Sequence, residues 1–303
     1  MSAIDEIGTS IGAVAERVGT SVVGVGRDGR GSGVVVGDGL VLTNAHNLRG
    51  REVTITFQDG RSTRGEVRGV DPDGDLAVVA VDTAGATPIE WSADGAASVG
   101  DPVFGAASTY GGGARVTLGF VSSVARSFRG PGGRRIAGSI EHTAPLAPGS
   151  SGGALVDGEG RLVGLNTNRI GEGFYLALPA DAGLRSRVDA LGRGESVERP
   201  RLGVAIAPNH VARRLRRSVG LPDRDGILVR GVEDGSPAAN AGVEVGDLIV
   251  SAGGREIRDA DDLQDALGSL EMPFDLVIVR GADEKTVTVT AVASKPERTP
   301  GDA

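Results

Sequence analysis

The chain has 303 residues, of which 39% are hydrophobic and only 3% aromatic, and its formal net charge is −8. An acidic chain of this size has room for two domains with cores of their own, and it is poorly suited to nucleic acid or an anionic membrane as its main partner. The absence of cysteine excludes disulfides and thiol catalysis, and three histidines are too few to favour a histidine-rich metal centre. We therefore expect a protein with no cofactor, no metal and no nucleic-acid partner.

The N-terminal sequence contains acidic residues and lacks the uninterrupted apolar core of a signal peptide. No stretch reaches the roughly 18 apolar residues of a membrane span. The sequence as it stands therefore predicts a soluble, cytoplasmic protein, and an exported one if a leader has been removed.

Short runs rich in Val, Leu and Ile, separated by Gly and Asp turns, extend from residue 21 to about 179 and predict an all-β unit. Six runs precede the irregular stretch 82–100 and six follow it, so we expect two small barrels. The runs are 21–25, 33–37, 40–44, 52–57, 63–70, 75–81, 101–108, 115–124, 135–143, 153–157, 161–167 and 173–179.

A helix is predicted to open near Ala180, and the polar stretch after it, which ends in a proline, is typical of a linker. Beyond it, strands alternate with three helical segments, at 210–221, 236–242 and 259–270, which predicts a smaller α+β domain. The expected organisation is an N-terminal segment 1–17, a mainly β domain 18–192, a linker 193–200, a second domain 201–293 and a disordered tail 294–303.

Ser151 lies in the glycine-rich loop PGSSGG, residues 148–153. Glycines allow such a loop to present one hydroxyl, although in a chain with 50 glycines the string alone is compatible with a flexible turn. A serine nucleophile needs a base and a carboxylate that orients the base. His46 follows one apolar run and Asp75 begins another, in the chain order His, Asp, Ser of chymotrypsin-type proteases. Taken singly, His46 is compatible with an idle strand-end histidine and Asp75 with a turn acid, but together the three predict a catalytic triad.

The segments around these residues resemble the HtrA/Deg family of trypsin-like serine proteases. They are GSGVVVGDGLVLTNAHNL, DPDGDLAVVAVD, RVTLGFVSSVAR and PGSSGGALVDGEGRLVGLNT. The second domain is similar to the PDZ domain of that family through RLGVAIA and GILVRGVEDGSPAANAGVEVGDLIVSAGGREI. The resemblance covers about residues 18–293, and it implies a chymotrypsin-like double β-barrel followed by a smaller α+β PDZ domain.

The resemblance also implies roles for single residues. His46 would be the general base, Asp75 its orienting carboxylate and Ser151 the nucleophile, with the backbone N–H groups of Gly149 and Ser151 as the oxyanion hole. The substrate pocket is expected at Pro145, Asn166, Thr167, Asn168, Gly173 and Phe174. Because Pro145, at its expected base, has no charge, small or medium aliphatic side chains are the expected fit.

In the second domain, the resemblance places a carboxylate-binding loop at Leu202, Gly203 and Val204, where backbone N–H groups would bind the C-terminus of a peptide. The alternative is an ordinary glycine-containing strand entry. Two positions beside the triad depart from the family pattern, which usually has Val or Ile at Asn47 and Asn at Ser150. These departures bear on the resting geometry of the nucleophile loop.

Two basic segments and one further histidine have other expected roles. His142 is expected to be a surface or strand-edge histidine, and the run RRLRR at 213–217 a solvated helix face. The Arg/Gly-rich loop 127–135 is compatible with a regulatory or a merely flexible segment.

The expected function is a serine endopeptidase for unfolded or damaged proteins in protein quality control, with a PDZ domain that binds peptide C-termini. The family resemblance adds a homotrimer as the expected assembly. Two alternatives stay open: a non-enzymatic, protease-like chaperone or peptide-binding scaffold, and an adaptor that acts mainly through residues 200–293.

Overall fold

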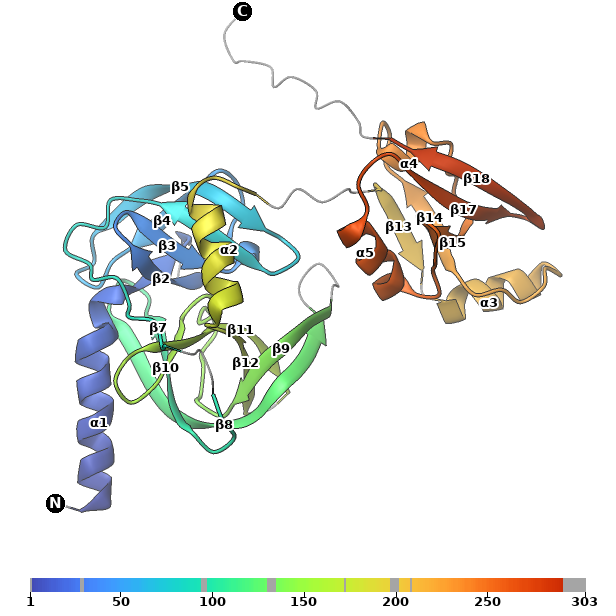
Figure 1. Ribbon diagram of the computed structural model, residues 1–303. Coiled ribbons are helices and arrows are strands. Elements are labelled where there is room, and N and C mark those ends of the chain that lie inside the picture. The colour runs from blue at the N-terminus through green and yellow to red at the C-terminus, as the bar shows by residue number, and fades with distance from the viewer. Residues whose placement is uncertain are drawn as a thin grey trace, which may run out of the picture. The chain divides into compact units, whose positions relative to one another are not determined.

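The computed structural model describes residues 2–27, 30–93, 97–129, 135–171, 173–196, 202–207 and 209–290. The chain divides into two compact units, Met1–Val197 and Glu198–Ala303 (Figure 1). The expected tail 294–303 and residues 197–200 of the expected linker lie outside the described residues. Over the ranges described, no helix has the length and apolar character needed to cross a membrane.

The described strands of the first unit close into two six-stranded antiparallel barrels, which confirms the prediction of two small barrels (Figure 1). The first barrel consists of β1 (Val22–Val25), β2 (Gly31–Gly37), β3 (Leu40–Thr43), β4 (Glu52–Thr56), β5 (Ser62–Asp71) and β6 (Leu76–Ala80). The second barrel consists of β7 (Pro102–Ser108), β8 (Ala114–Arg129), β9 (Arg135–His142), β10 (Ala154–Val156), β11 (Leu162–Ile170) and β12 (Phe174–Pro179).

Branched aliphatic side chains fill three buried clusters in this unit. One lies inside the first barrel and includes Val41 and Ile55, and another lies inside the second barrel and includes Leu155. The third joins the barrels, because it combines Leu42 of β3 with Leu165 of β11. This shared cluster holds the two barrels against each other.

Two helices pack on the barrels. The first, α1 (Ala3–Val18), begins with a capping box, in which Ser2 Oγ accepts from the N–H of Asp5 and Asp5 Oδ2 accepts from the N–H of Ser2. The helix buries Val14 and Val18 in the cluster between the barrels. It accounts for residues 3–17 of the expected N-terminal segment 1–17. The second, α2 (Ala182–Gly192), starts after Asp181, close to the predicted opening near Ala180.

The second unit is an α+β fold, as expected. Its sheet has the strand order β13 (Val204–Ala207), β14 (Ile227–Val232), β15 (Leu248–Ala252), β17 (Phe274–Arg280) and β18 (Asp283–Val289), and β16 (Arg255–Glu256) pairs with β15. Its helices are α3 (Asn209–Ser218), α4 (Pro237–Asn240) and α5 (Ala260–Ser269). In this order β13 is an edge strand.

The basic run on α3 differs in part from the solvated face that the sequence predicted. The guanidinium of Arg216 is buried, and it donates to the carbonyl oxygens of Pro222 and Gly281. Arg216 therefore ties the helix to two neighbouring turns, because its five donors can satisfy carbonyls that would otherwise lack partners. Arg213 and Arg217 remain outside and pair with aspartates.

Candidate active site

His46 and Asp75 meet at the ends of two neighbouring strands of the first barrel. His46 lies in a 3₁₀ turn, Ala45–Asn47, directly after β3, and Asp75 directly precedes β6, which pairs with β3. Nδ1 of His46 lies 2.8 Å from Oδ2 and 3.0 Å from Oδ1 of Asp75. The backbone N–H of His46 also donates to Oδ1, at 3.1 Å. A carboxylate in this position favours the tautomer with its proton on Nδ1, which leaves Nε2 as a base.

Asp75 is itself held from three sides and is only 1% exposed. Its backbone has φ of +54°, a left-handed conformation that a non-glycine residue adopts rarely. Asn44 Nδ2 donates to the carbonyl oxygen of Asp75, and the hydroxyl of Thr167 donates to its Oδ2, both at 2.9 Å. Thr167 comes from β11 of the second barrel, so the Asp75 carboxylate is fixed by both barrels. Sequence reasoning assigned Thr167 only to the pocket and missed Asn44.

The loop that carries Ser151 connects β9 to β10 in the second barrel, and residues of the first barrel hold it. The carbonyl oxygen of Ser151 accepts from the N–H of Ser32 at 2.8 Å and from Asn47 Nδ2 at 2.9 Å. The hydroxyl of Ser32 donates to the carbonyl oxygen of Gly149, also at 2.9 Å. Asn47 thus makes a hydrogen bond to the backbone of Ser151 that the aliphatic residue usual in the family could not make.

The hydroxyl of Ser151 donates to the carbonyl oxygen of Thr167 at 2.9 Å. For Ser151 to act as a nucleophile, this proton must be released to Nε2 of His46. Hydrogen bonds between nucleophile and base are often long or poorly aligned without substrate and tighten when substrate binds.

Two backbone N–H groups of the nucleophile loop are available to a ligand. In the described part of the chain, the amides of Gly149 and Ser151 donate to no protein acceptor. Gly149 has φ of +88° and Gly152 has φ of +86°, conformations that glycine adopts without strain. A Cβ atom on Gly152 would come within 2.2 Å of the carbonyl oxygen of Ser32. Two free amides on either side of Ser150 can stabilise a developing oxyanion.

A cavity of about 220 Å³ adjoins this loop. It is lined by Leu146, Ala147, Pro148, Gly149, Ser150, Ser151, Asn166, Thr167 and Tyr175. Of the pocket residues expected from the sequence, Asn166 and Thr167 lie on this lining. No carboxylate or basic side chain belongs to this set of described lining residues, which leaves the cavity without a charged partner for Lys or Arg.

The other expected pocket residues lie elsewhere. Pro145 is exposed and outside the lining, and its carbonyl oxygen accepts from the Thr117 hydroxyl at 2.8 Å. Gly173 and Phe174 are exposed and also outside the lining, and the side chain of Asn168 lies outside the described residues. Leu146 and Tyr175, which sequence reasoning missed, contribute the apolar surface instead.

His142 is buried, which overturns the expectation of a surface or strand-edge histidine. The side chain is 0% exposed, lies 3.1 Å from Asn166 Oδ1 through Nε2, and stacks on Tyr175 with ring centroids 5.8 Å apart. Burial lowers the pKa of His142 to about 4, and the hydrogen bond to Asn166 offsets only part of that effect. At neutral pH, an uncharged imidazole therefore supports the strand that lines the cavity.

In the second unit, the expected carboxylate-binding loop stands at the start of the edge strand. Gly203 has φ of +72°, and its carbonyl oxygen accepts from the N–H of Glu233 at 2.8 Å. Val204 begins β13, which pairs with β14 on one side. Leu202 is buried in one cluster with Leu263 of α5. An extended peptide can add to the remaining edge of such a strand.

Comparison with known proteins agrees with both units. Residues 31–165 match the trypsin-like peptidase domain, and residues 228–280 match the PDZ domain. The serine protease HhoA of Synechocystis sp. is 35% identical over 286 residues, which cover 86% of this chain and 70% of that protein. A DegP-like periplasmic serine endoprotease of Halomonas elongata is 30% identical, with 86% of this chain and 56% of that protein covered.

Among solved structures, the HtrA-type protease AlgW with a decapeptide aligns with a TM-score of 0.67 at 24% identity, covering 94% of this chain and 99% of that chain. This likeness supports the fold. The identity and coverage of HhoA, together with the two domain matches, show the family. The chain belongs to the HtrA/Deg family of trypsin-like serine proteases with a C-terminal PDZ domain.

Proposed function

We propose that this serine protease cleaves unfolded or damaged polypeptides by acyl transfer to Ser151. The observation that carries the proposal is the contact of His46 Nδ1 with the buried Asp75 carboxylate at 2.8 Å, beside a serine loop anchored to the same barrel. His46 Nε2 takes the proton of the Ser151 hydroxyl as its oxygen attacks the peptide carbonyl. The amides of Gly149 and Ser151 stabilise the oxyanion that forms.

The second half of the reaction uses the same groups. Protonated His46 gives its proton to the nitrogen of the leaving amine, and the peptide bond breaks to leave an acyl-enzyme on Ser151. Water then attacks the acyl carbon and gives a proton to His46. The bond between the acyl carbon and Ser151 Oγ breaks, and His46 returns its proton to that oxygen, which restores the hydroxyl and releases the acid. Asp75 remains ionised throughout, because its task is to hold the ring and stabilise the imidazolium.

The cavity beside Ser151 supports a preference for unfolded chains. Its lining is apolar at Leu146, Ala147 and Tyr175, so it suits a small or medium aliphatic side chain before the cut bond. Such side chains are mostly buried in folded proteins. An enzyme that must bind one of them in an extended segment therefore acts mainly on polypeptides that have lost their fold.

The second unit supports a role in binding peptide C-termini. A free edge on β13, next to amides at Leu202 and Gly203, suits an added peptide strand whose carboxylate meets backbone N–H groups. A peptide C-terminus bound at this site would either recruit the substrate to the protease unit or regulate the protease activity. A homotrimer, expected by resemblance, belongs to the proposal as its assembly and is tested by light scattering on the full chain.

The proposed activity is tested by comparing wild type with Ser151→Ala on a denatured protein and its folded form. We expect wild type to cleave the denatured form after Val, Ala or Leu, a fluorophosphonate probe to label it, and the variant to lose about 10⁴- to 10⁶-fold in rate. Cleavage by Ser151→Ala at a rate near wild type would contradict the assignment of Ser151 as the nucleophile. Cleavage mainly after Arg or Lys would contradict the proposed aliphatic pocket. If both proteins only suppress aggregation, the non-enzymatic chaperone is supported.

A second experiment addresses the PDZ unit. A hydrophobic peptide with a free C-terminal carboxylate is compared with its amidated form, in full-length protein, for binding and for its effect on hydrolysis of a reporter peptide. We expect only the free acid to bind tightly. Equal binding of both forms would contradict carboxylate recognition, and unchanged hydrolysis at saturation would limit the domain to tethering substrates.

A further inference from the structure

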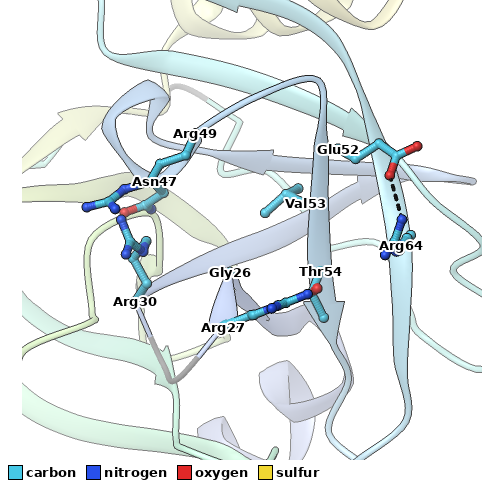
Figure 2. A pocket seen from close by; sticks show the side chains of 9 residues that line it. All are labelled: Gly26, Arg27, Arg30, Asn47, Arg49, Glu52, Val53, Thr54 and Arg64. Atoms are coloured by element: carbon cyan, nitrogen blue, oxygen red, sulfur yellow. Dashed lines mark hydrogen bonds and ion pairs between the residues drawn. The ribbon is translucent and has the colours of Figure 1, made fainter.

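A second cavity, of about 330 Å³, lies on the first barrel and is lined mainly by arginine (Figure 2). Its lining comprises Gly26, Arg27, Arg30, Asn47, Arg49, Glu52, Val53, Thr54 and Arg64. These residues come from the end of β1, the turn after it, the segment after His46, and strands β4 and β5. Four guanidinium groups and one carboxylate therefore line this cavity. The cavity is positively charged, although the net charge of the chain is −8.

Among the described residues, most of this positive charge has no carboxylate partner. Glu52 is engaged by Arg64, whose Nη1 lies 3.0 Å from Oε2. Within the ranges that the structure describes, Arg27, Arg30 and Arg49 form no ion pair with a carboxylate. Figure 2 shows Arg30 and Arg49 beside Asn47 on one side of the cavity, away from the Glu52–Arg64 pair. Guanidinium groups present planar pairs of donors that match a carboxylate, so this side favours an anionic ligand.

Asn47 connects the cavity to the catalytic site. It follows His46 directly in the chain, and its Nδ2 donates to the carbonyl oxygen of Ser151 at 2.9 Å. Gly31, the neighbour of Arg30, packs against the Asn47 amide so closely that a Cβ atom would lie 2.4 Å from its Cγ. One side chain thus separates the arginine-lined cavity from the nucleophile.

The direction of the substrate follows from the chemistry. The apolar cavity beside Ser151 belongs to the second barrel, whereas His46 belongs to the first. Because His46 must deliver a proton to the leaving amine, the chain that follows the cut bond passes on the His46 side. That segment leaves the active site over the first barrel, where Arg30 and Arg49 lie.

We propose that this arginine-lined cavity binds acidic side chains within the first four substrate residues after the cut bond. The inference rests on the proposed protease function and adds a second specificity element to it. The first cavity selects an aliphatic side chain before the cut, and the second selects Asp or Glu after it. Released acidic product segments bind the same arginines.

The test uses two fluorogenic peptides that share an aliphatic residue before the cut and differ by Glu or Gln at two of the following four positions. We expect wild type to cleave the Glu peptide about 5-fold more efficiently in kcat/KM, the upper range for an exposed ion pair. The ratio should fall to about 1 in the double variant Arg30→Gln, Arg49→Gln, and also in wild type at high salt, because exposed charges are screened. The control is Arg68→Gln, which removes one positive charge, against two in the double variant, from an exposed position outside the cavity and should keep the ratio.

A binding measurement separates this inference from the proposed function. Fluorescence anisotropy of the two labelled peptides with Ser151→Ala needs no cleavage, and the Glu peptide should bind about 5-fold more tightly. If wild type cleaves neither peptide but this affinity ratio stands, the protease proposal fails and the cavity assignment holds. Equal affinities for Glu and Gln peptides overturn the cavity assignment. It is also overturned if Arg68→Gln loses the ratio as fully as the double variant, or if pyrophosphate binds while the two peptides remain equal.

Discussion

Acidic pH is expected to destabilise the protease unit through His142. Its Nε2 faces Asn166 Oδ1 at 3.1 Å, and Asn166 Nδ2 donates to the carbonyl oxygen of Ala154 at 2.8 Å. Asn166 Oδ1 is therefore the acceptor, so neutral His142 carries its proton on Nε2. Nδ1 is buried and has no partner among the described residues. Protonation would place a charge and an unsatisfied N–H donor inside the second barrel.

The magnitude follows from the pKa of His142, which burial lowers from 6.5 to about 4. Between these two values the unfolded chain binds more protons than the folded one, so stability decreases as the pH falls through this window and is fully present above it. A shift of this size corresponds to roughly 3 kcal/mol once the pH is below the folded-state pKa, and to about 2 kcal/mol at pH 5.

The assay is denaturant unfolding at pH 7.5 and pH 5 for wild type and His142→Gln, followed by fluorescence of Trp91. This residue is the only tryptophan of the chain and packs against the cluster between the barrels. Glutamine keeps an N–H donor for Asn166 but does not titrate. Wild type should lose about 2 kcal/mol more than the variant between the two pH values, while contributions from carboxylates cancel in the comparison. An equal loss in both proteins would refute the reasoning.

Three further substitutions test the triad, the Ser151 loop and the PDZ unit. Asp75→Asn should lower kcat by about 10⁴-fold with the fold retained, because the His46 ring loses its orienting charge. Steady-state kinetics measure the loss of kcat, and circular dichroism checks that the fold is retained. Gly152→Ala should abolish activity and destabilise the unit, since its Cβ would lie 2.2 Å from a backbone oxygen, whereas Gly158→Ala, with open space around it, should be near neutral in both respects. Gly203→Ala, whose Cβ would lie 2.3 Å from that of Ser236, should weaken peptide binding to the PDZ unit while fluorophosphonate labelling persists.

The barrels were predictable because their signal is local. Each run of alternating or continuous Val, Leu and Ile between Gly and Asp turns became one strand, since a strand in a small closed barrel needs an apolar inner face. The helix α1 had a local signal as well, in the capping box of Ser2 and Asp5 and in apolar residues at Ile7, Ile11 and Val14. We predicted no helix over this segment.

Two predictions failed because they depended on which face of a strand a side chain occupies. His142 was placed outside on the alternation of its run towards solvent, yet it pairs with Val121 of β8 and Tyr175 of β12, and its ring lies inside the barrel. Phe174 was chosen for the pocket wall, but successive strand residues point to opposite faces, and its neighbour Tyr175 lines the cavity. A one-residue shift in a strand reverses every such assignment.

The part that no local pattern reveals is the contact between the barrels. Ser32 and Asn47 of the first barrel hold the carbonyl oxygen of Ser151 in the second, and Thr167 of the second barrel holds the Asp75 carboxylate in the first. Each barrel thus fixes a residue of the proposed triad in the other. The geometry of the site is therefore a property of the packed pair of barrels, because neither barrel alone contains both His46 and Ser151. The sequence could therefore point to candidate residues for the site, whereas the hydrogen bonds between the barrels emerged only from the fold.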